Sequence, residues 1–196
     1  MKTIAYSLFV ALFLATALFP QKSFNVKTAV MISEGDGVSK LKSNDLQKAS
    51  NQFRILLNSE AAGFVYFLME SKGKVKLLSS GKATAKVTST YPKFEGYSAL
   101  PPKGEHKFII FFSTKKLSSL EELFKKSSEV SAKNFSSVLN NYKKTQTSIS
   151  DKSPEDIYLA GNTKGLQEML DNNFLQKLKP FAVKSLLILE YKFRTK

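Results

Sequence analysis

The chain contains no cysteine, a single histidine and only two arginines among its 196 residues. Without cysteine it forms no disulfide, has no thiolate nucleophile or metal ligand, and offers no thiol for a lipid anchor behind a signal peptide. The formal net charge is nevertheless +14, so lysine supplies nearly all of the excess. Lysine acts as a hydrated point charge, whereas planar arginine suits bidentate recognition of phosphates and bases. The excess therefore favours diffuse attraction to anionic surfaces over nucleic-acid recognition, unless it serves solubility alone.

The N-terminus has the pattern of a secretory signal peptide. A positively charged start is followed by an uncharged, largely apolar run over residues 3–21, which carries the small residues Ala15-Thr16-Ala17 near its end. This pattern predicts a signal peptide at residues 1–17, with cleavage as late as about residue 23. An uncleaved anchor needs roughly 20 apolar residues, and Pro20 ends the run first. We therefore expect a periplasmic or secreted protein of bacterial type that does not span the membrane after cleavage.

The rest of the chain has the composition of a globular protein. Hydrophobic residues make up 42% of the sequence, including sixteen phenylalanines and seven tyrosines. About 175 residues remain after the signal, a length typical of one domain. We expect a single β-rich domain over residues 24–196 with a helical insert at about 118–180.

Apolar patterning predicts most strands of this domain. Alternation with period two marks half-buried strands, and short runs that are apolar on both faces mark strands inside a sheet or sandwich. The predicted strands cover residues 24–32, 53–57, 64–69, 75–78, 108–112 and 183–194, with a weaker one at 82–90. Residues 53–78 would form a three-stranded meander, and the polar residues 40–50 would hold one short helical turn.

Helical signals are confined to the later part of the chain. A capping-box pattern begins at Ser118, apolar residues from Phe135 to Tyr142 recur at helical spacing, and further helix starts are expected at Ser153 and near Leu166. The terminal strand needs cover for its apolar face, so it should return to the first sheet. The predicted fold class is mainly β with a helical insert (α+β), an antiparallel β-sandwich or curled sheet with helices between the last two strands.

A series of short motifs follows one another in the first half of the chain. They are Phe53-Arg54-Ile55, Gly63-Phe64-Val65-Tyr66, Gly73-Lys74-Val75, Gly96 with Pro101, Pro102-Lys103-Gly104-Glu105, and Phe108 to Ser113 with Leu117. Their order resembles domain-of-unknown-function family 4384, a bacterial β-rich module of envelope and signalling proteins. The resemblance covers about a third of the chain, and Leu78-Ser79-Ser80 stands where the family has Phe-Pro-Asn. It implies a β-rich fold and an envelope compartment, and it carries over no catalytic residues.

Candidate residues for catalysis or metal binding are scarce. His106, the only histidine, lies at the start of an apolar strand, and no Gly-x-Ser-x-Gly elbow supplies a nucleophile for it. Glu34 and Asp36 flank a turn without the spacing of a calcium loop. No phosphate-binding glycine-rich loop is present. We therefore expect no catalytic, cofactor-binding or metal-binding residues.

The most unusual polar feature is a stretch with lysines and no acid between Glu70 and Glu95. Its lysines are Lys72, Lys74, Lys76, Lys82, Lys86 and Lys93. The first three alternate, so on a strand they would project from one face at steps of roughly 6.6 Å. Such a stripe would attract anionic material, although lysines also guard an edge strand against unwanted pairing.

Aromatic residues lie beside this stripe. Such aromatics would either stack on sugars or bases or cover the core beneath a long loop. Core cover is the expectation for Phe94, and it is less expected for Tyr91 and Tyr97. The favoured function is a non-enzymatic binding or accessory module of the bacterial cell envelope, without cofactor or nucleic acid, whose partner is an anionic glycan, a lipid head group or an acidic protein. Two alternatives stay open: a hydrolase that uses scattered carboxylates, and a structural partner that docks through its helical insert.

Overall fold

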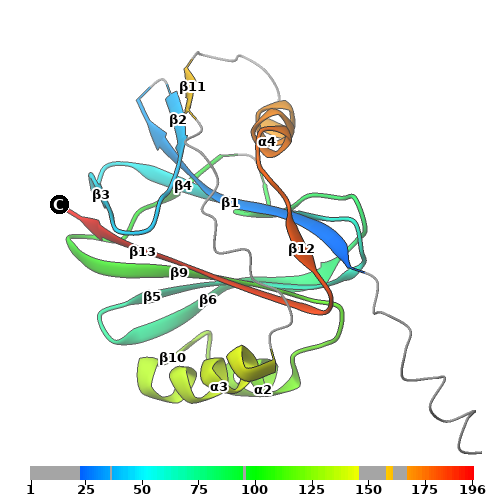
Figure 1. The fold of residues 1–196 in the computed structure, drawn as a ribbon. Coiled ribbons are helices and arrows are strands. Elements are labelled where there is room, and N and C mark those ends of the chain that lie inside the picture. Colours follow the sequence, from blue (N-terminus) through cyan, green and yellow to red (C-terminus); the bar gives the residue numbers. More distant parts are fainter. Residues whose placement is uncertain (1–22, 36, 95, 146–157, 161–166) are drawn as a thin grey trace, which may run out of the picture.

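A computed structural model describes residues 23–35, 37–94, 96–145, 158–160 and 167–196. The expected signal peptide and the helix start expected at Ser153 lie outside the described residues. The described chain is mostly β, and two sheets stack face to face (Figure 1). The predicted fold class, a β-rich sandwich with helices late in the chain, is confirmed.

The first sheet has seven strands in the order β11-β2-β1-β4-β7, with β12 paired to β1 and β8 paired to β4. Its members are β1 (Phe24–Glu34), β2 (Gly37–Lys40), β4 (Gln52–Ser59), β7 (Ser89–Tyr91), β8 (Ser98–Ala99), β11 (Tyr158–Ala160) and β12 (Phe181–Val183). The antiparallel pair of β1 and β4 forms its centre. Both strands occur where period-two alternation predicts them.

The second sheet has six strands in the order β10-β6-β5-β9-β13-β3. Its members are β3 (Asp45–Gln47), β5 (Gly63–Ser71), β6 (Lys74–Ala83), β9 (Gly104–Ser113), β10 (Glu129–Ser131) and β13 (Leu186–Thr195). The terminal strand β13 pairs antiparallel with β9 over ten residues. This confirms that the end of the chain returns to a sheet built by the first half.

Helices cover the outer faces of both sheets. Helices α2 (Ser118–Phe124) and α3 (Ala132–Thr145) lie on the six-stranded sheet, and α4 (Gln167–Gln176) lies on the seven-stranded sheet (Figure 1). The insert expected at 118–180 is therefore divided between two faces, and it also contributes β10 and β11. Within the described residues, none of the helices has the length and apolar character needed to cross a membrane.

Three clusters of buried side chains hold these layers together. The largest lies between the sheets, a second between the six-stranded sheet and α2 with α3, and a third between the seven-stranded sheet and α4. Strands β5 and β9 are apolar on both faces because one face meets the other sheet and the opposite face meets the helices. Phe108 and Phe111 of β9 illustrate this, since they belong to different clusters and are both fully buried.

The expected meander over residues 53–78 is wrong. Strand β4 pairs with β1, β7 and β8 in the first sheet, whereas β5 pairs with β6 and β9 in the second. Only the hairpin of β5 and β6 survives from the prediction. At the start of β5, a side chain on Gly63 would run into the carbonyl of Ser113 and come within 2.8 Å of the Phe112 ring, so β5 and β9 approach too closely for any larger residue.

Two shorter predictions also need correction. The segment 40–50 holds no helical turn but the strand β3, which pairs in parallel with the end of β13. The polar sequence of β3 gives no sign of a strand, and its extended conformation is held by backbone pairing to β13. The weak strand expected at 82–90 is divided, because β6 continues to Ala83 and β7 begins at Ser89.

Candidate functional site

The six lysines of the predicted stripe do not form one surface. They lie in the β5–β6 turn and at the start of β6 (Lys72, Lys74, Lys76), at the end of β6 (Lys82), and in the two loops that flank β7 (Lys86, Lys93). The Lys74 ammonium pairs with Glu129 of β10 at 2.8 Å. Strand β10 also pairs with β6 along residues 74–76, so the interpretation of this segment as a lysine-guarded edge is wrong.

The aromatic residues beside the stripe differ from expectation in their exposure: the two tyrosines pack inward and Phe94 is exposed. Tyr91 stacks on Phe53 with ring centroids 5.9 Å apart, and it packs against the core between the sheets. Tyr97 packs against the cluster under α4, and its hydroxyl accepts a hydrogen bond from Gln167 at 3.5 Å. Phe94, expected to cover the core, is 86% exposed. Both tyrosines are therefore half-buried and pack against the interior of the protein.

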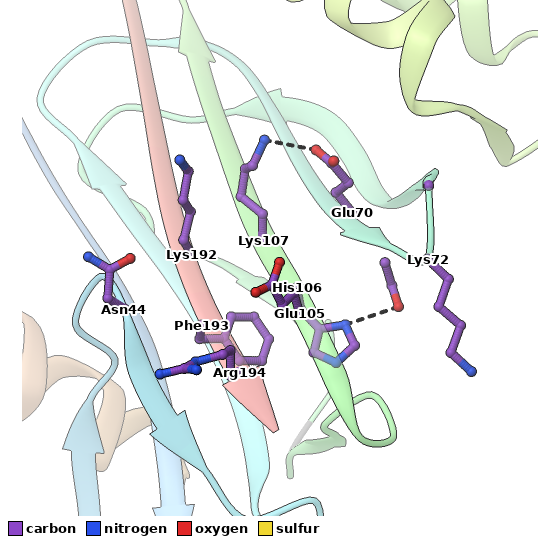
Figure 2. Close-up of a pocket in the computed structure, with 11 residues that line it drawn as sticks. Asn44, Glu70, Lys72, Glu105, His106, Lys107, Lys192, Phe193 and Arg194 are labelled. Carbon is purple, nitrogen blue, oxygen red and sulfur yellow. Dashed lines mark hydrogen bonds and ion pairs between the residues drawn. The ribbon is translucent and has the colours of Figure 1, made fainter. Parts of the chain in front are cut away.

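A charged hollow lies at one end of the six-stranded sheet, beside the β5–β6 turn (Figure 2). It has a volume of about 790 Å³. Four cations and two carboxylates contribute to its lining: Lys72, Lys107, Lys192, Arg194, Glu70 and Glu105. Lys72 is the one member of the predicted stripe that reaches it.

Strand register brings most of these residues together. Lys107 of β9 lies between Glu70 of β5 and Lys192 of β13, and Glu105 lies opposite Arg194. Cross-strand neighbours share one face of a sheet, and residues two apart on a strand return to that face. The charged side chains therefore form one row across β5, β9 and β13 and a shorter adjacent row across β9 and β13.

Lys107 is neutralised within the hollow. Its ammonium lies 2.8 Å from a Glu70 carboxylate oxygen and 3.3 Å from Glu190, which also pairs with Lys143 of α3. Burial alone would lower the pKa of Lys107, but the two carboxylates raise it above its usual value. Burial would likewise raise the pKa of Glu190, yet Lys143 and Lys107 lower it. These shifts favour the charged forms of Lys107 and Glu190.

The other cations of the hollow are Lys72, Lys192 and Arg194. Within the described part of the chain, Lys72, Lys192 and Arg194 have no carboxylate within salt-bridge distance. Lys192 stands opposite Lys107, whose own charge is already balanced by Glu70 and Glu190. An anionic group in the hollow would balance the remaining charges of Lys72, Lys192 and Arg194.

Next to the hollow, both ring nitrogens of His106 have hydrogen-bond partners. Its Nε2 lies 2.9 Å from the Pro102 carbonyl oxygen and 3.0 Å from the Thr195 hydroxyl, and its Nδ1 lies 3.0 Å from the Ser71 hydroxyl. A carbonyl only accepts, so Nε2 carries the proton and donates it. Nδ1 then accepts from Ser71. The ring is buried and packs against Phe193 at 5.3 Å.

This arrangement favours a structural histidine over a catalytic one. Ser71 donates a hydrogen bond to the imidazole, as a serine nucleophile does to its base. Among the described residues, however, no carboxylate is hydrogen-bonded to the ring, and both ring nitrogens already have partners. The hydrolase alternative expects an acidic cleft, whereas the hollow has more cations than carboxylates. In the described residues, no three acidic or histidine side chains gather as a metal site would require.

We predict that His106 titrates below its usual range. Burial lowers the pKa of the imidazole, and the charge of Lys72 lowers it further against the opposing hydrogen bond to Pro102. As pH falls below about 6.5, the unfolded chain takes up this proton before the folded chain does, so the free energy of unfolding should decrease. Because the chain has one histidine, its ring proton gives a single resolved NMR titration. A midpoint at or above about 6.5 would contradict the assignment, and His106→Gln should remove this part of the pH dependence.

The alternative of docking through the helical insert needs an exposed apolar face on α3. Phe135 is buried instead, and Val138 and Tyr142 pack against the same cluster on the six-stranded sheet. Phe111 contacts the rings of Phe135 and Tyr142 edge-on, at 6.5 Å and 6.3 Å. The apolar face of α3 is therefore used within the fold.

Comparison with known proteins adds no relative. No family model matches the sequence, and neither the curated proteins nor the solved structures include a significant match. The resemblance over residues 53–117 stays a prediction. Sequence reasoning missed Lys107, Lys192 and Arg194, although Glu190, Lys192 and Arg194 alternate along the predicted last strand and so indicated a charged face there.

Proposed function

We propose that this chain is an exported, non-enzymatic binding module of the bacterial envelope that holds an anionic group of its partner in the charged hollow. One observation carries the proposal most directly: among the described residues, Lys192 and Arg194 line the hollow without an ion-pair partner. Export rests on the signal-like residues 1–17. The hollow thus replaces the lysine stripe as the proposed binding surface, with Lys72 shared by both.

The chemistry of the hollow suits a carboxylate, phosphate or sulfate group. Arg194 offers a planar guanidinium for two parallel hydrogen bonds, and Lys72 and Lys192 add point charges. Lys74 contributes less than expected because Glu129 already neutralises it. An anionic glycan, a lipid head group and an acidic protein all carry such groups, so the affinities for probes of different classes distinguish these partners.

Reversing two charges in the hollow tests the proposal. We expect Lys192→Glu/Arg194→Glu to weaken binding of dextran sulfate, a sulfated glycan probe, by roughly tenfold to a hundredfold, because charge-assisted hydrogen bonds are lost and repulsion is added. Isothermal titration calorimetry on the full chain gives the affinity. Poly-L-glutamate in a second series represents an acidic protein. Wild-type affinity should fall as salt is raised.

A matched control separates the hollow from net charge. Lys126→Glu/Lys133→Glu makes the same change in total charge at exposed positions on the α2–α3 side, and we expect it to weaken binding several-fold less. Lys74→Glu/Lys76→Glu tests the stripe in the same way. Equal losses in all three variants would show attraction to overall charge and reject a site in the hollow.

A further inference from the structure

A second surface combines exposed apolar side chains with lysines at the edge of the seven-stranded sheet. Lys86-Val87 precedes β7 and Lys93-Phe94 follows it, so each end of this short strand has a lysine beside an apolar residue. Val87 is 56% exposed and Phe94 is 86% exposed. Both lysines are also exposed. These four residues are called the β7 tips below.

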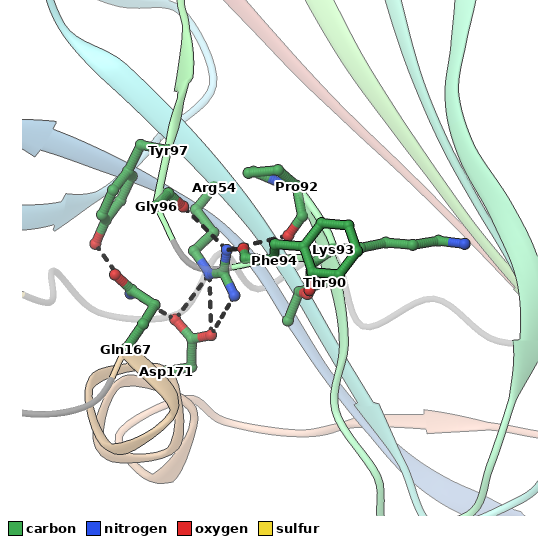
Figure 3. Close-up of polar contacts among 9 residues, drawn as sticks. All are labelled: Arg54, Thr90, Pro92, Lys93, Phe94, Gly96, Tyr97, Gln167 and Asp171. Atoms are coloured by element: carbon green, nitrogen blue, oxygen red, sulfur yellow. Dashed lines mark hydrogen bonds and ion pairs between the residues drawn. The ribbon is translucent and has the colours of Figure 1, made fainter.

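The Phe94 tip is fixed to the interior of the protein by Arg54 (Figure 3). The Nη1 of Arg54 donates to the carbonyls of Pro92, Phe94 and Gly96 at 3.0, 2.8 and 3.0 Å. The same guanidinium is buried and paired with Asp171 of α4 at 2.9 Å. A buried charge thus holds the backbone on both sides of Phe94, while its ring stays in solvent.

The Val87 tip is also held by hydrogen bonds. The amide of Lys86 donates to the Ser59 carbonyl at 2.6 Å, the amide of Val87 donates to Thr84 at 3.1 Å, and Asn58 donates to the Lys86 carbonyl at 3.2 Å. The two apolar side chains therefore stand at set positions on either end of β7, which itself spans about 10 Å. Because these hydrogen bonds already hold the backbone of Lys86, Val87 and Phe94, little of its conformational entropy is lost when they bind.

We infer that the β7 tips attach the protein to an anionic lipid surface. Between the tips lie Thr88, Ser89, Thr90, Tyr91 and Pro92, all of them half-buried, and the Tyr91 ring packs on Phe53 of the core. Val87 and Phe94 are therefore separate exposed side chains and not parts of one large apolar patch of the kind found at the centre of a protein interface. Separate apolar side chains flanked by lysines suit the boundary of a bilayer, where rings enter the acyl region and ammonium groups stay with anionic head groups. The net charge of +14 adds long-range attraction.

The chain contains no tryptophan, so Phe94→Trp places a single fluorescent reporter on the tip of the full chain. With vesicles of phosphatidylcholine and phosphatidylglycerol we expect a blue shift of its emission and quenching by brominated acyl chains. With phosphatidylcholine alone we expect neither. Leu46→Trp, at a position 53% exposed on β3, is the matched control and should stay at the emission of water. Each tryptophan reports the surroundings of its own position, so vesicle binding through residues 3–21 alone would not produce the expected change in emission.

A second pair of variants measures affinity. Val87→Ser/Phe94→Ser should lower the fraction of protein that sediments with anionic vesicles, with a loss in affinity of about tenfold or more, whereas Leu46→Ser should not. Emission of the F94W protein that stays at the water value in the presence of anionic vesicles would overturn the inference. Equal sedimentation of V87S/F94S and wild type would also overturn it and point to a protein partner for Phe94.

Discussion

Asp171→Ala is expected to destabilise the protein by roughly 3–5 kcal/mol, the usual cost of leaving one member of a buried ion pair uncompensated. Arg54 and Asp171 have side chains only 5% and 4% exposed, and they contact each other through both Nε and Nη2 of the arginine. Removing the carboxylate leaves a guanidinium in the interior with only backbone carbonyls as partners. Denaturant unfolding, followed by circular dichroism, gives the change in free energy.

Two further variants on α4 make this result interpretable. Asp171→Asn keeps an oxygen for Arg54 but removes the charge, so its cost should be smaller. Asn172→Ala changes an exposed neighbour on the same helix and should alter stability by no more than about 0.5 kcal/mol. A loss below about 1 kcal/mol for Asp171→Ala would be too small for a buried uncompensated charge and would contradict the described pairing.

Phe108→Ala is expected to cost about 3–5 kcal/mol, the range found when a large buried aromatic is deleted. Phe108 is fully buried in the cluster between the sheets. Its ring centroid lies 4.5 Å from that of Phe53 in the opposite sheet and 4.9 Å from that of Phe193 on β13. The substitution therefore removes contacts that join the two sheets and leaves a cavity that neighbouring rings fill only in part.

The same replacement at Phe94 is the control for this effect. Phe94→Ala removes a ring that is 86% exposed, and we expect the free energy of unfolding to change by no more than about 0.5 kcal/mol. Both proteins are measured by urea unfolding under identical conditions. Similar losses for the two variants would show that Phe94 is packed in the core, as the sequence alone suggested, and would also remove the basis for the β7 tips.

Much of the fold follows from apolar spacing, because spacing reports which faces of an element are covered. Alternation predicted β1, β4 and β13, runs apolar on both faces predicted β5 and β9, and helical spacing near Phe135 predicted α3. Spacing does not report which sheet a strand joins, so β4 was assigned to the wrong neighbours. It also gave no sign of β3, whose short polar segment is held by backbone pairing to β13.

The site was less accessible to sequence reasoning because it depends on register between distant strands. Glu70, Lys107 and Lys192 become neighbours only through the alignment of β5, β9 and β13. Likewise, Arg54 and Asp171 are 117 residues apart, and no local pattern links them. The same pair contacts the backbone that carries the exposed Phe94, since Arg54 donates to the Phe94 carbonyl.

Anion binding in the charged hollow is tested most directly by NMR. Backbone amide shifts of the labelled full chain are followed while a short sulfated oligosaccharide is added at low salt. Binding in the hollow predicts that the largest shifts occur at residues 70–73, 105–107 and 192–194, and that they disappear in Lys192→Glu/Arg194→Glu. Shifts spread evenly over the 30 basic residues, or concentrated elsewhere, would contradict a binding site in the hollow.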